Sequence, residues 1–165
     1  AFNYLGPLTN PAGADVQVCG TWSDEAAEKI AGALALLGLE RGFVVHGSDG
    51  LGELTITGPS TVFSVQSGNI DRMIVTPEDF GLAPQPSEAI QGGNAERNRA
   101  IAESILCGQK GAPRDIVIMN SALALVAVGK AADFREAAAL AAESIDSGAA
   151  QSKLAQLREA VAMVA

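Results

Sequence analysis

The second half of the chain consists of long apolar runs separated by glycines and by residues that commonly cap helices. Asn94 follows a pair of glycines and is a suitable N-cap, and Gly108 is a suitable stop. Pro113 opens a run that is apolar on nearly every face, which predicts a central buried helix. The four helices expected here extend from 94 to about 107, from 113 to 128, from 133 to about 147 and from about 149 to the C-terminus.

The first half combines one helical run with short β-rich runs. Ser23 is a good N-cap for an Ala- and Leu-rich run that closes at Gly38, and Phe43–His46 is a candidate buried strand. Residues 1–20 are punctuated by glycine and proline and predict a shaped loop with one short helical turn. Three further strands and a helical turn are expected at Leu54–Thr57, Thr61–Val65, Ile70–Val75 and Pro77–Phe80.

This order of elements predicts an α/β fold, a mixed β-sheet flanked by helices with a helical C-terminal half. The strands separated by short turns indicate a small antiparallel addition to the sheet. The sequence shows no repeat, linker or low-complexity tract, so residues 1–165 are interpreted as a single α/β domain.

The net charge and the length of the apolar runs argue against nucleic acids and membranes as partners of this chain. The formal net charge of −8 disfavours a broad nucleic-acid surface, because an acidic surface repels a polyanion. The longest apolar run, 116–129, is shorter than the about 20 residues that a membrane span needs, so no membrane partner is expected. No signal peptide is visible, and Cys19 and Cys107 match no metal or redox spacing. A cytoplasmic protein with two buried free thiols is therefore expected.

Candidate chemistry is densest at 47–53, directly after the predicted strand Phe43–His46. Three glycines let the backbone approach a ligand, and Asp49 and Glu53 supply two carboxylates. Ligands of open α/β sheets bind outside the carboxyl ends of strands, and oxygen ligands suit Mg²⁺. A glycine-rich turn whose carboxylates cap local N–H groups explains the pattern equally well, so both interpretations stay open.

Three other segments carry weaker signals. The lone His46 lacks a visible partner for a triad or metal site, which favours a structural role. The segment 92–94 could offer backbone N–H groups to an anion, although helix capping explains it as well. Lys110 and Arg114 could attract phosphate, but a solvated turn between helices, with Arg114 as its anchor, is the favoured interpretation.

Six segments, in order and with similar gaps, resemble the anthranilate phosphoribosyltransferase family of tryptophan biosynthesis. The first and last segments are the specific ones, whereas the glycine-rich segments alone would be weak. The six segments are 2–12, 44–53, 76–82, 92–95, 114–122 and 145–148.

The resemblance implies transfer of a phosphoribosyl group from phosphoribosyl pyrophosphate to the amine of anthranilate, with Mg²⁺ as cofactor. It implies the large α/β domain of the nucleoside phosphorylase/phosphoribosyltransferase-like fold, within a homodimeric two-domain enzyme. Gly6 and Pro7 match the glycine and proline that line the family's anthranilate tunnel. Glu53 matches the glutamate that helps to hold Mg²⁺ and pyrophosphate, and no catalytic residue is assigned.

The chain departs from the family pattern in two ways. Gly52 stands where the family usually has a metal-associated aspartate, and Asn94 stands where aspartate is common. The family's glycine-rich loop, its Lys-His-Gly-Asn stretch and its anthranilate-binding arginine do not occur in these 165 residues. The chain is therefore expected to be the C-terminal part of a larger enzyme and inactive alone. The alternative is a non-catalytic binding protein of the same fold.

Overall fold

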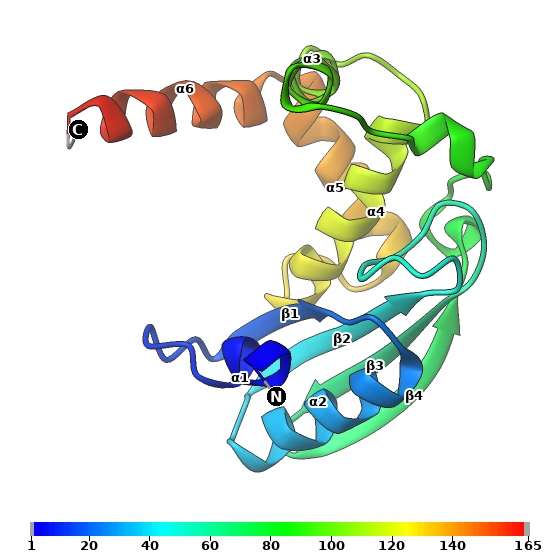
Figure 1. Cartoon of the computed structure of the whole chain (residues 1–165), viewed down its shortest axis with the longest axis vertical. Helices are drawn as coiled ribbons and strands as arrows, with labels where there is room; N and C mark the ends of the chain where they lie inside the picture. The colour runs from blue at the N-terminus through cyan, green and yellow to red at the C-terminus, as the bar shows by residue number, and fades with distance from the viewer. Residues whose placement is uncertain (1, 164–165) are drawn as a thin grey trace.

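The computed structural model describes the chain from residue 2 to residue 163, with side chains from residue 5 onward (Figure 1). Its strands form one mixed sheet, and α-helices lie on both faces of that sheet. The elements are α1 (Phe2–Leu8), β1 (Val16–Gly20), α2 (Asp24–Leu36), β2 (Arg41–Gly47), β3 (Ser60–Gln66), β4 (Asn69–Val75), the 3₁₀ turns η1 (Pro77–Phe80) and η2 (Ser87–Ile90), α3 (Ala95–Leu106), α4 (Ala112–Ala127), α5 (Phe134–Asp146) and α6 (Ala149–Ala162).

The sheet has the order β1-β2-β3-β4, with β1 parallel to β2 and the other pairs antiparallel. Consecutive side chains of a strand point to opposite faces. Val44 therefore packs into the cluster around α2, whereas Phe43 and Val45 pack into the cluster formed with α4 and α5. Strand β2 is covered on both sides, which explains why residues 42–45 are buried in succession rather than alternately.

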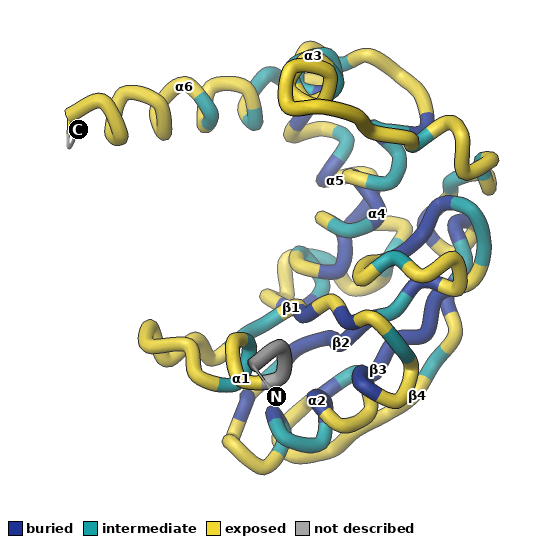
Figure 2. The backbone as a smooth tube through the Cα atoms, viewed as in Figure 1, coloured by how far each residue is buried: buried dark blue, intermediate teal, exposed yellow. Residues whose placement is uncertain are grey.

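The larger cluster lies between the sheet and the helices α4 and α5. Phe134, at the start of α5, stacks on Phe80 with ring centroids 4.9 Å apart and meets Phe43 edge to face at 6.1 Å. Figure 2 shows the buried backbone concentrated in the middle strands and in the helices packed on them. This core fixes the carboxyl end of β2 relative to α4, which sets the geometry of the candidate site.

The predicted helix starts are confirmed. The side chain of Ser23 accepts a hydrogen bond from the Ala26 amide, 3.2 Å away, at the start of α2. Asn94 accepts from Arg97 N at 2.9 Å, and Asp133 accepts from a backbone amide at 2.8 Å. Each cap satisfies one amide that the first helical turn leaves unpaired. The antiparallel addition formed by β3 and β4 and the turn η1 are also confirmed.

Two predictions in the first half are wrong. Residues 16–20 form strand β1 rather than loop, because they pair in parallel with β2. Residues 54–57 form no strand, although Leu54, Thr55 and Ile56 are completely buried. Their backbone groups are paired outside the sheet ladder: the Thr55 amide donates to Ser60 Oγ at 3.0 Å, and the Ile56 carbonyl accepts from the Gln85 amide at 2.9 Å. Burial therefore accounts for the β-like sequence without a neighbouring strand.

Two predictions of burial are only half right. Cys19 is buried, and burial raises the pKa of its thiol, but Cys107 is exposed at the C-terminal end of α3. Helix α4 packs against the sheet and α5, yet it keeps an exposed stripe in place of the expected burial on every face. The stripe consists of Val117, Ser121, Ala124 and Val128.

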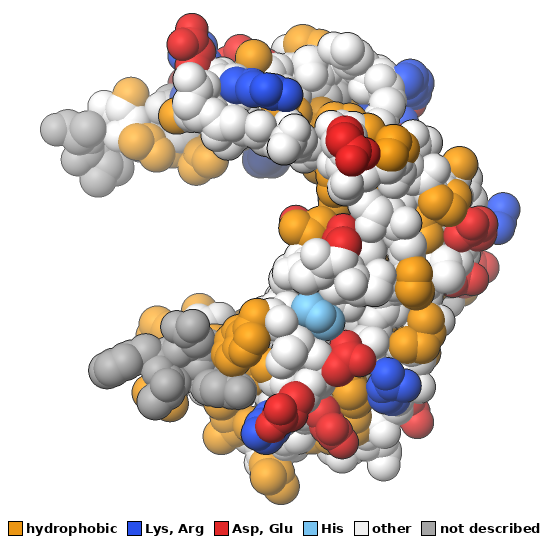
Figure 3. Space-filling view, turned by 45° about the vertical axis from the view of Figure 1, so that its right-hand side comes forward, with side chains coloured by type: hydrophobic (Ala, Val, Ile, Leu, Met, Phe, Trp, Pro, Cys, Tyr) orange, Lys and Arg blue, Asp and Glu red, His pale blue; other side chains and the backbone are white. Residues whose placement is uncertain are grey.

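The predicted C-terminal helix is confirmed as α6, which is followed by its C-cap Met163. Residues 164 and 165 lie outside the described residues. None of its residues is buried, and the helix extends away from the rest of the molecule (Figures 1 and 2). The space-filling view shows a hollow between this helix and the end of the molecule that holds the sheet (Figure 3). Within residues 2–163, no helix is both long and apolar enough to cross a membrane.

Candidate functional site

The loop of residues 48–59 leaves the carboxyl end of β2 and contains the acidic residues singled out above. Strands β1 and β2 are parallel, so their carboxyl ends share one edge of the sheet, where open α/β sheets bind ligands. The loop passes directly over the end of β1: a Cβ atom at Gly20 would lie 1.6 Å from the carbonyl oxygen of Gly52. Glycine at position 20 therefore permits the path of the loop.

The Asp49 side chain is hydrogen-bonded to other residues of the same loop. Its carboxylate accepts hydrogen bonds from Thr55 Oγ1 at 2.5 Å, Thr57 Oγ1 at 2.9 Å and the Leu51 amide at 3.2 Å. Partial burial alone would raise the pKa of Asp49, but these hydrogen bonds to the charged form outweigh it and hold the pKa below its ordinary value. The interpretation as a capping carboxylate is therefore confirmed for Asp49.

Glu53 is the contrasting carboxylate. It is exposed, and no hydrogen bond or ion pair to another described residue engages its side chain. It lines a cavity of about 280 Å³ together with Gly92 and Asn98, and the remaining wall is mainly apolar. A carboxylate that stands free at the rim of such a cavity can accept an external cation or hydrogen-bond donor. The apolar wall includes Leu51, Ile101, Ile105 and Ile116.

The donor set at this edge suits Mg²⁺ only in part. Within the described residues, no three His, Cys, Asp or Glu side chains gather into a metal site, and Asp49 is already engaged. Mg²⁺ commonly takes one or two carboxylates and completes its shell with water and substrate phosphates. Glu53 alone therefore fits a Mg²⁺ ion that a diphosphate brings, but it cannot form a protein-only cage.

Gly52 leaves room for a Cβ atom at the position where the resemblance leads us to expect an aspartate. A Cβ atom at this position would lie 3.4 Å from the nearest atom, the Thr21 carbonyl oxygen, which is an ordinary contact. The backbone of residue 52 is outside the left-handed region, so it is compatible with an L side chain. A side chain at position 52 therefore meets no steric obstacle at its Cβ atom.

The segment Gly92–Asn94 acts as a helix cap. Asn98 binds both backbone groups of Gly93, accepting from its amide at 2.8 Å and donating to its carbonyl at 3.1 Å. Asn94 caps α3, as described above. The Gly93 N–H that an anion would need is therefore already used. This arrangement supports capping over anion binding.

Gly6 and Pro7 lie in α1, away from the cavity of Glu53. The Pro7 carbonyl accepts a hydrogen bond from Gln17 Nε2 at 3.0 Å, which ties α1 to β1. Pro7 lines a separate cavity of about 290 Å³ beside Leu39 and the C-terminal end of α2. Within the described chain, Gly6, Pro7 and Glu53 are not brought together in one cavity.

His46 is held by the backbone. Its Nδ1 lies 3.0 Å from the Thr21 carbonyl oxygen, and a carbonyl only accepts, so the neutral ring carries its proton on Nδ1. This bond supports the structural role expected for it. The ring reaches the molecular surface, where the only histidine appears in pale blue in Figure 3.

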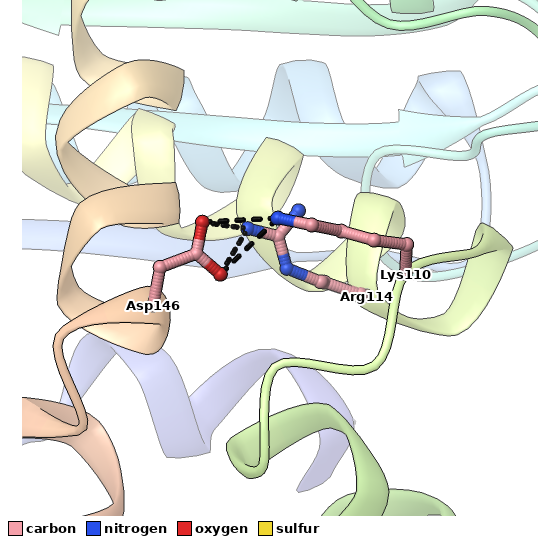
Figure 4. A network of polar contacts seen from close by, with 3 residues as sticks. All are labelled: Lys110, Arg114 and Asp146. Carbon is pink, nitrogen blue, oxygen red and sulfur yellow. Dashed lines mark hydrogen bonds and ion pairs between the residues drawn. The ribbon is translucent and has the colours of Figure 1, made fainter.

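Lys110 and Arg114 converge on one carboxylate rather than on an open anion site (Figure 4). Lys110 Nζ lies 3.0 Å from Asp146 Oδ2, and Arg114 Nη2 lies 2.9 Å from both carboxylate oxygens. The hydrogen bond from Lys110, together with those from Arg114, lowers the pKa of Asp146. The network joins the turn before α4 to the end of α5, so the anchoring role of Arg114 is supported.

Asn120 is the residue that sequence reasoning missed. It lies in the middle of α4, yet its side chain accepts from the Leu54 amide at 2.9 Å and donates to the Leu54 carbonyl at 3.0 Å. A carboxamide within an otherwise apolar helical run was the available signal. Its partner is 66 residues away, and no local pattern could identify it.

Comparisons with known proteins agree on one family. A family model described as "Glycosyl transferase family, a/b domain" matches residues 1–151. An anthranilate phosphoribosyltransferase of Solibacter usitatus is 54% identical over 158 residues, which is 96% of this chain and 46% of that protein. One of Geobacter sp. is 52% identical over 156 residues, or 94% of this chain and 44% of the relative.

Solved structures agree with these matches. The anthranilate phosphoribosyltransferase of Thermus thermophilus superposes with a TM-score of 0.80 and 44% identity, covering 89% of this chain and 43% of that one. The enzyme of Saccharomyces cerevisiae in complex with PRPP and Mg gives 0.87 at 29% identity, covering 98% and 47%. The chain thus spans about half the length of the relatives it matches, and it has their fold.

Proposed function

Because the chain belongs to the glycosyl transferase family with this a/b domain, we propose that it is the C-terminal α/β part of an anthranilate phosphoribosyltransferase. The full protein would transfer phosphoribosyl from phosphoribosyl pyrophosphate to anthranilate, a step of tryptophan biosynthesis. The observation that carries the proposal is the identity of about half of all residues with such enzymes, together with a free Glu53 carboxylate at the ligand-binding edge of the sheet.

The reaction exchanges one bond at the ribose for another. The anthranilate nitrogen bonds to C1 of the ribose as the bond from C1 to the pyrophosphate oxygen breaks, and the amine then loses a proton. Positive charge develops on the ribose and negative charge on the leaving group, so the site must stabilise the leaving charge and exclude water. The apolar wall beside Glu53 provides such exclusion on one side.

Glu53 is proposed to hold the cation that accompanies the diphosphate. Mg²⁺ would supply charge neutralisation on pyrophosphate, as the Saccharomyces cerevisiae relative in complex with PRPP and Mg suggests. Glu53 would contribute one oxygen ligand, and Asp49 would keep the loop in shape without touching the metal. Gly6 and Pro7 are proposed to line the anthranilate site, which orients the amine.

The two proposed sites need additional polypeptide to become one pocket. Pro7 and Glu53 line separate cavities, and the matched relatives are about twice as long as this chain. We therefore expect no useful turnover by the isolated chain and propose a homodimer for the full-length protein. Anthranilate fluorescence, followed with phosphoribosyl pyrophosphate and Mg²⁺, measures this directly; robust turnover by the pure chain contradicts the proposal.

A chimera tests the function itself. The chain would replace the corresponding 158 residues of the Solibacter usitatus relative, and the consumption of anthranilate would be compared with that of the intact relative. The expected result is turnover that falls at least tenfold in the matched Glu53→Gln chimera. A chimera that is folded by circular dichroism yet inert contradicts a catalytic role for this chain.

A non-catalytic binding protein of the same fold is the second candidate, and Gly52 is the observation that favours it. Because position 52 has room for a side chain, the Gly52→Asp chimera provides the discriminating test. Under the catalytic proposal, the parent chimera is active and this variant lowers the Mg²⁺ concentration needed for half-maximal rate. Under the alternative, the parent chimera is inert, and only the restored carboxylate gives turnover.

A further inference from the structure

The Asn120 side chain uses its carboxamide oxygen and both of its N–H groups in hydrogen bonds. It accepts from the Leu54 amide and donates to the carbonyls of Leu54 and Ile116, the latter at 3.0 Å. Both backbone groups of Leu54 are thus paired by one side chain, as a neighbouring strand would pair them. At Leu54, a single side chain of α4 therefore takes the place of a pairing strand.

The position of this contact gives it a role beyond packing. Leu54 is completely buried and directly follows Glu53, which is exposed. Ile116, one turn before Asn120 on α4, lines the same cavity as Glu53. Asn120 therefore connects the cavity wall on α4 to the peptide that carries the free carboxylate.

The other hydrogen bonds of the loop do not perform this task. Asp49 and its threonines hold the residues before and after Glu53, and Ser60 holds the Thr55 amide. Asn98 binds the opposite rim of the cavity at Gly93. Among the described residues, only Asn120 joins α4 to the backbone next to Glu53.

We propose that Asn120 is a positioning residue: it sets the Glu53 carboxylate at the rim of the cavity so that the carboxylate can meet a cation carried by a diphosphate. The proposal rests on the function proposed above for Glu53. Asn120 touches neither substrate nor cation; it acts through Leu54. Asparagine suits the role because aspartate would turn an oxygen toward two carbonyl oxygens, those of Leu54 and Ile116.

Hydrogen–deuterium exchange of the whole chain tests the positioning directly. Asn120→Asp is expected to raise exchange at residues 51–56 at least tenfold while β3 and α2 keep their protection. Ser121→Ala, the exposed neighbour on α4, is the matched control and should change nothing. Equal loss of protection throughout the chain, or no change at 51–56, would overturn the positioning role.

A paramagnetic probe separates this inference from the proposed function. Mn²⁺ with inorganic pyrophosphate is added to the labelled chain, and broadening of amide signals near Glu53 is measured by NMR. Glu53→Gln should abolish local broadening, and Asn120→Asp should weaken it at least threefold. If Glu53→Gln has no effect, the cation role of Glu53 fails, whereas the exchange result still decides whether Asn120 fixes the loop. Full broadening in Asn120→Asp overturns its positioning of the carboxylate.

Discussion

The two segments proposed to bind substrate, the loop of residues 48–59 and helix α1, are attached to the molecule in opposite ways. The loop carries completely buried residues and is held by side chains from α4 and β3. In helix α1, whose side chains are described from residue 5 onward, Leu5 and Gly6 are exposed, Pro7 and Leu8 are partly buried, and one described hydrogen bond reaches the sheet, from Gln17 to the Pro7 carbonyl. The described contacts therefore hold the backbone around Glu53 more firmly than the backbone around Gly6 and Pro7.

The largest expected difference between the two segments comes from truncating one leucine in each. Leu54→Ala should lower the free energy of unfolding by about 2–5 kcal/mol, because it leaves a cavity at a site without solvent contact. Leu5→Ala in α1 is the matched control; Leu5 is 49% exposed, so its loss should cost less than about 0.5 kcal/mol. Urea denaturation followed by circular dichroism measures both, and equal losses would remove the contrast.

Hydroxyl groups provide the next comparison. Thr55→Val removes a completely buried hydroxyl that donates to Asp49 and accepts from the Thr57 amide. Because the Asp49 carboxylate can be rehydrated, we expect a loss of about 1–2 kcal/mol in unfolding free energy. Thr9→Val removes an exposed hydroxyl bound to the Leu5 carbonyl, and the same denaturation assay should show less than about 0.5 kcal/mol. A larger loss of unfolding free energy in Thr9→Val than in Thr55→Val would contradict the conclusion that the loop is held more firmly than α1.

The pH dependence of stability tests Asp49 in particular. Its folded pKa lies below the ordinary value of 3.8, so the folded state favours the charged carboxylate. The stabilisation is present above the unfolded pKa and is lost as the pH falls from about that value through the lower folded pKa. In the Asp49→Asn variant, the urea concentration at the midpoint of unfolding should therefore change less between about pH 5 and about pH 2 than it does in the parent protein. These limits bracket the titration of a carboxyl group. Parallel curves for the two proteins would contradict this role.

The smallest expected effect is on α1. Gln17→Ala removes the described hydrogen bond between β1 and the Pro7 carbonyl and should lower global stability by only about 0.5–1 kcal/mol. Protease cleavage within residues 2–13 should become faster, while cleavage in the loop of residues 48–59 stays unchanged. Unchanged cleavage at α1 would show that other contacts hold this helix.

Local signals predicted most of the fold. The failures occur where contacts between residues distant in the sequence determine the structure. Ser23, Asn94 and Asp133 were recognisable as caps because each acts on an amide within three residues. Strand β1 was missed because its partner strand lies 25 residues further along the chain. Residues 54–57 were assigned to a strand because their burial, not their pairing, dictates the apolar pattern.

Contacts between distant residues also limited how far the candidate site could be predicted from the sequence. Asp49 and Glu53 are equivalent in sequence, four residues apart in a glycine-rich segment. The folded loop separates their roles, since threonines engage Asp49 and leave Glu53 free. The contribution of Asn120 depends on a contact across 66 residues, which only the packing of α4 against the loop creates.

The crossing of Gly20 beneath Gly52 constrains which variants of this protein survive. A methyl group at position 20 would overlap the backbone oxygen of residue 52, so a saturation library should be depleted of every codon there except those for glycine. Position 52 faces no comparable obstacle and should tolerate alanine or aspartate. Substitutions can therefore add or remove an acidic side chain at residue 52, whereas the path of the backbone above β1 requires glycine at residue 20.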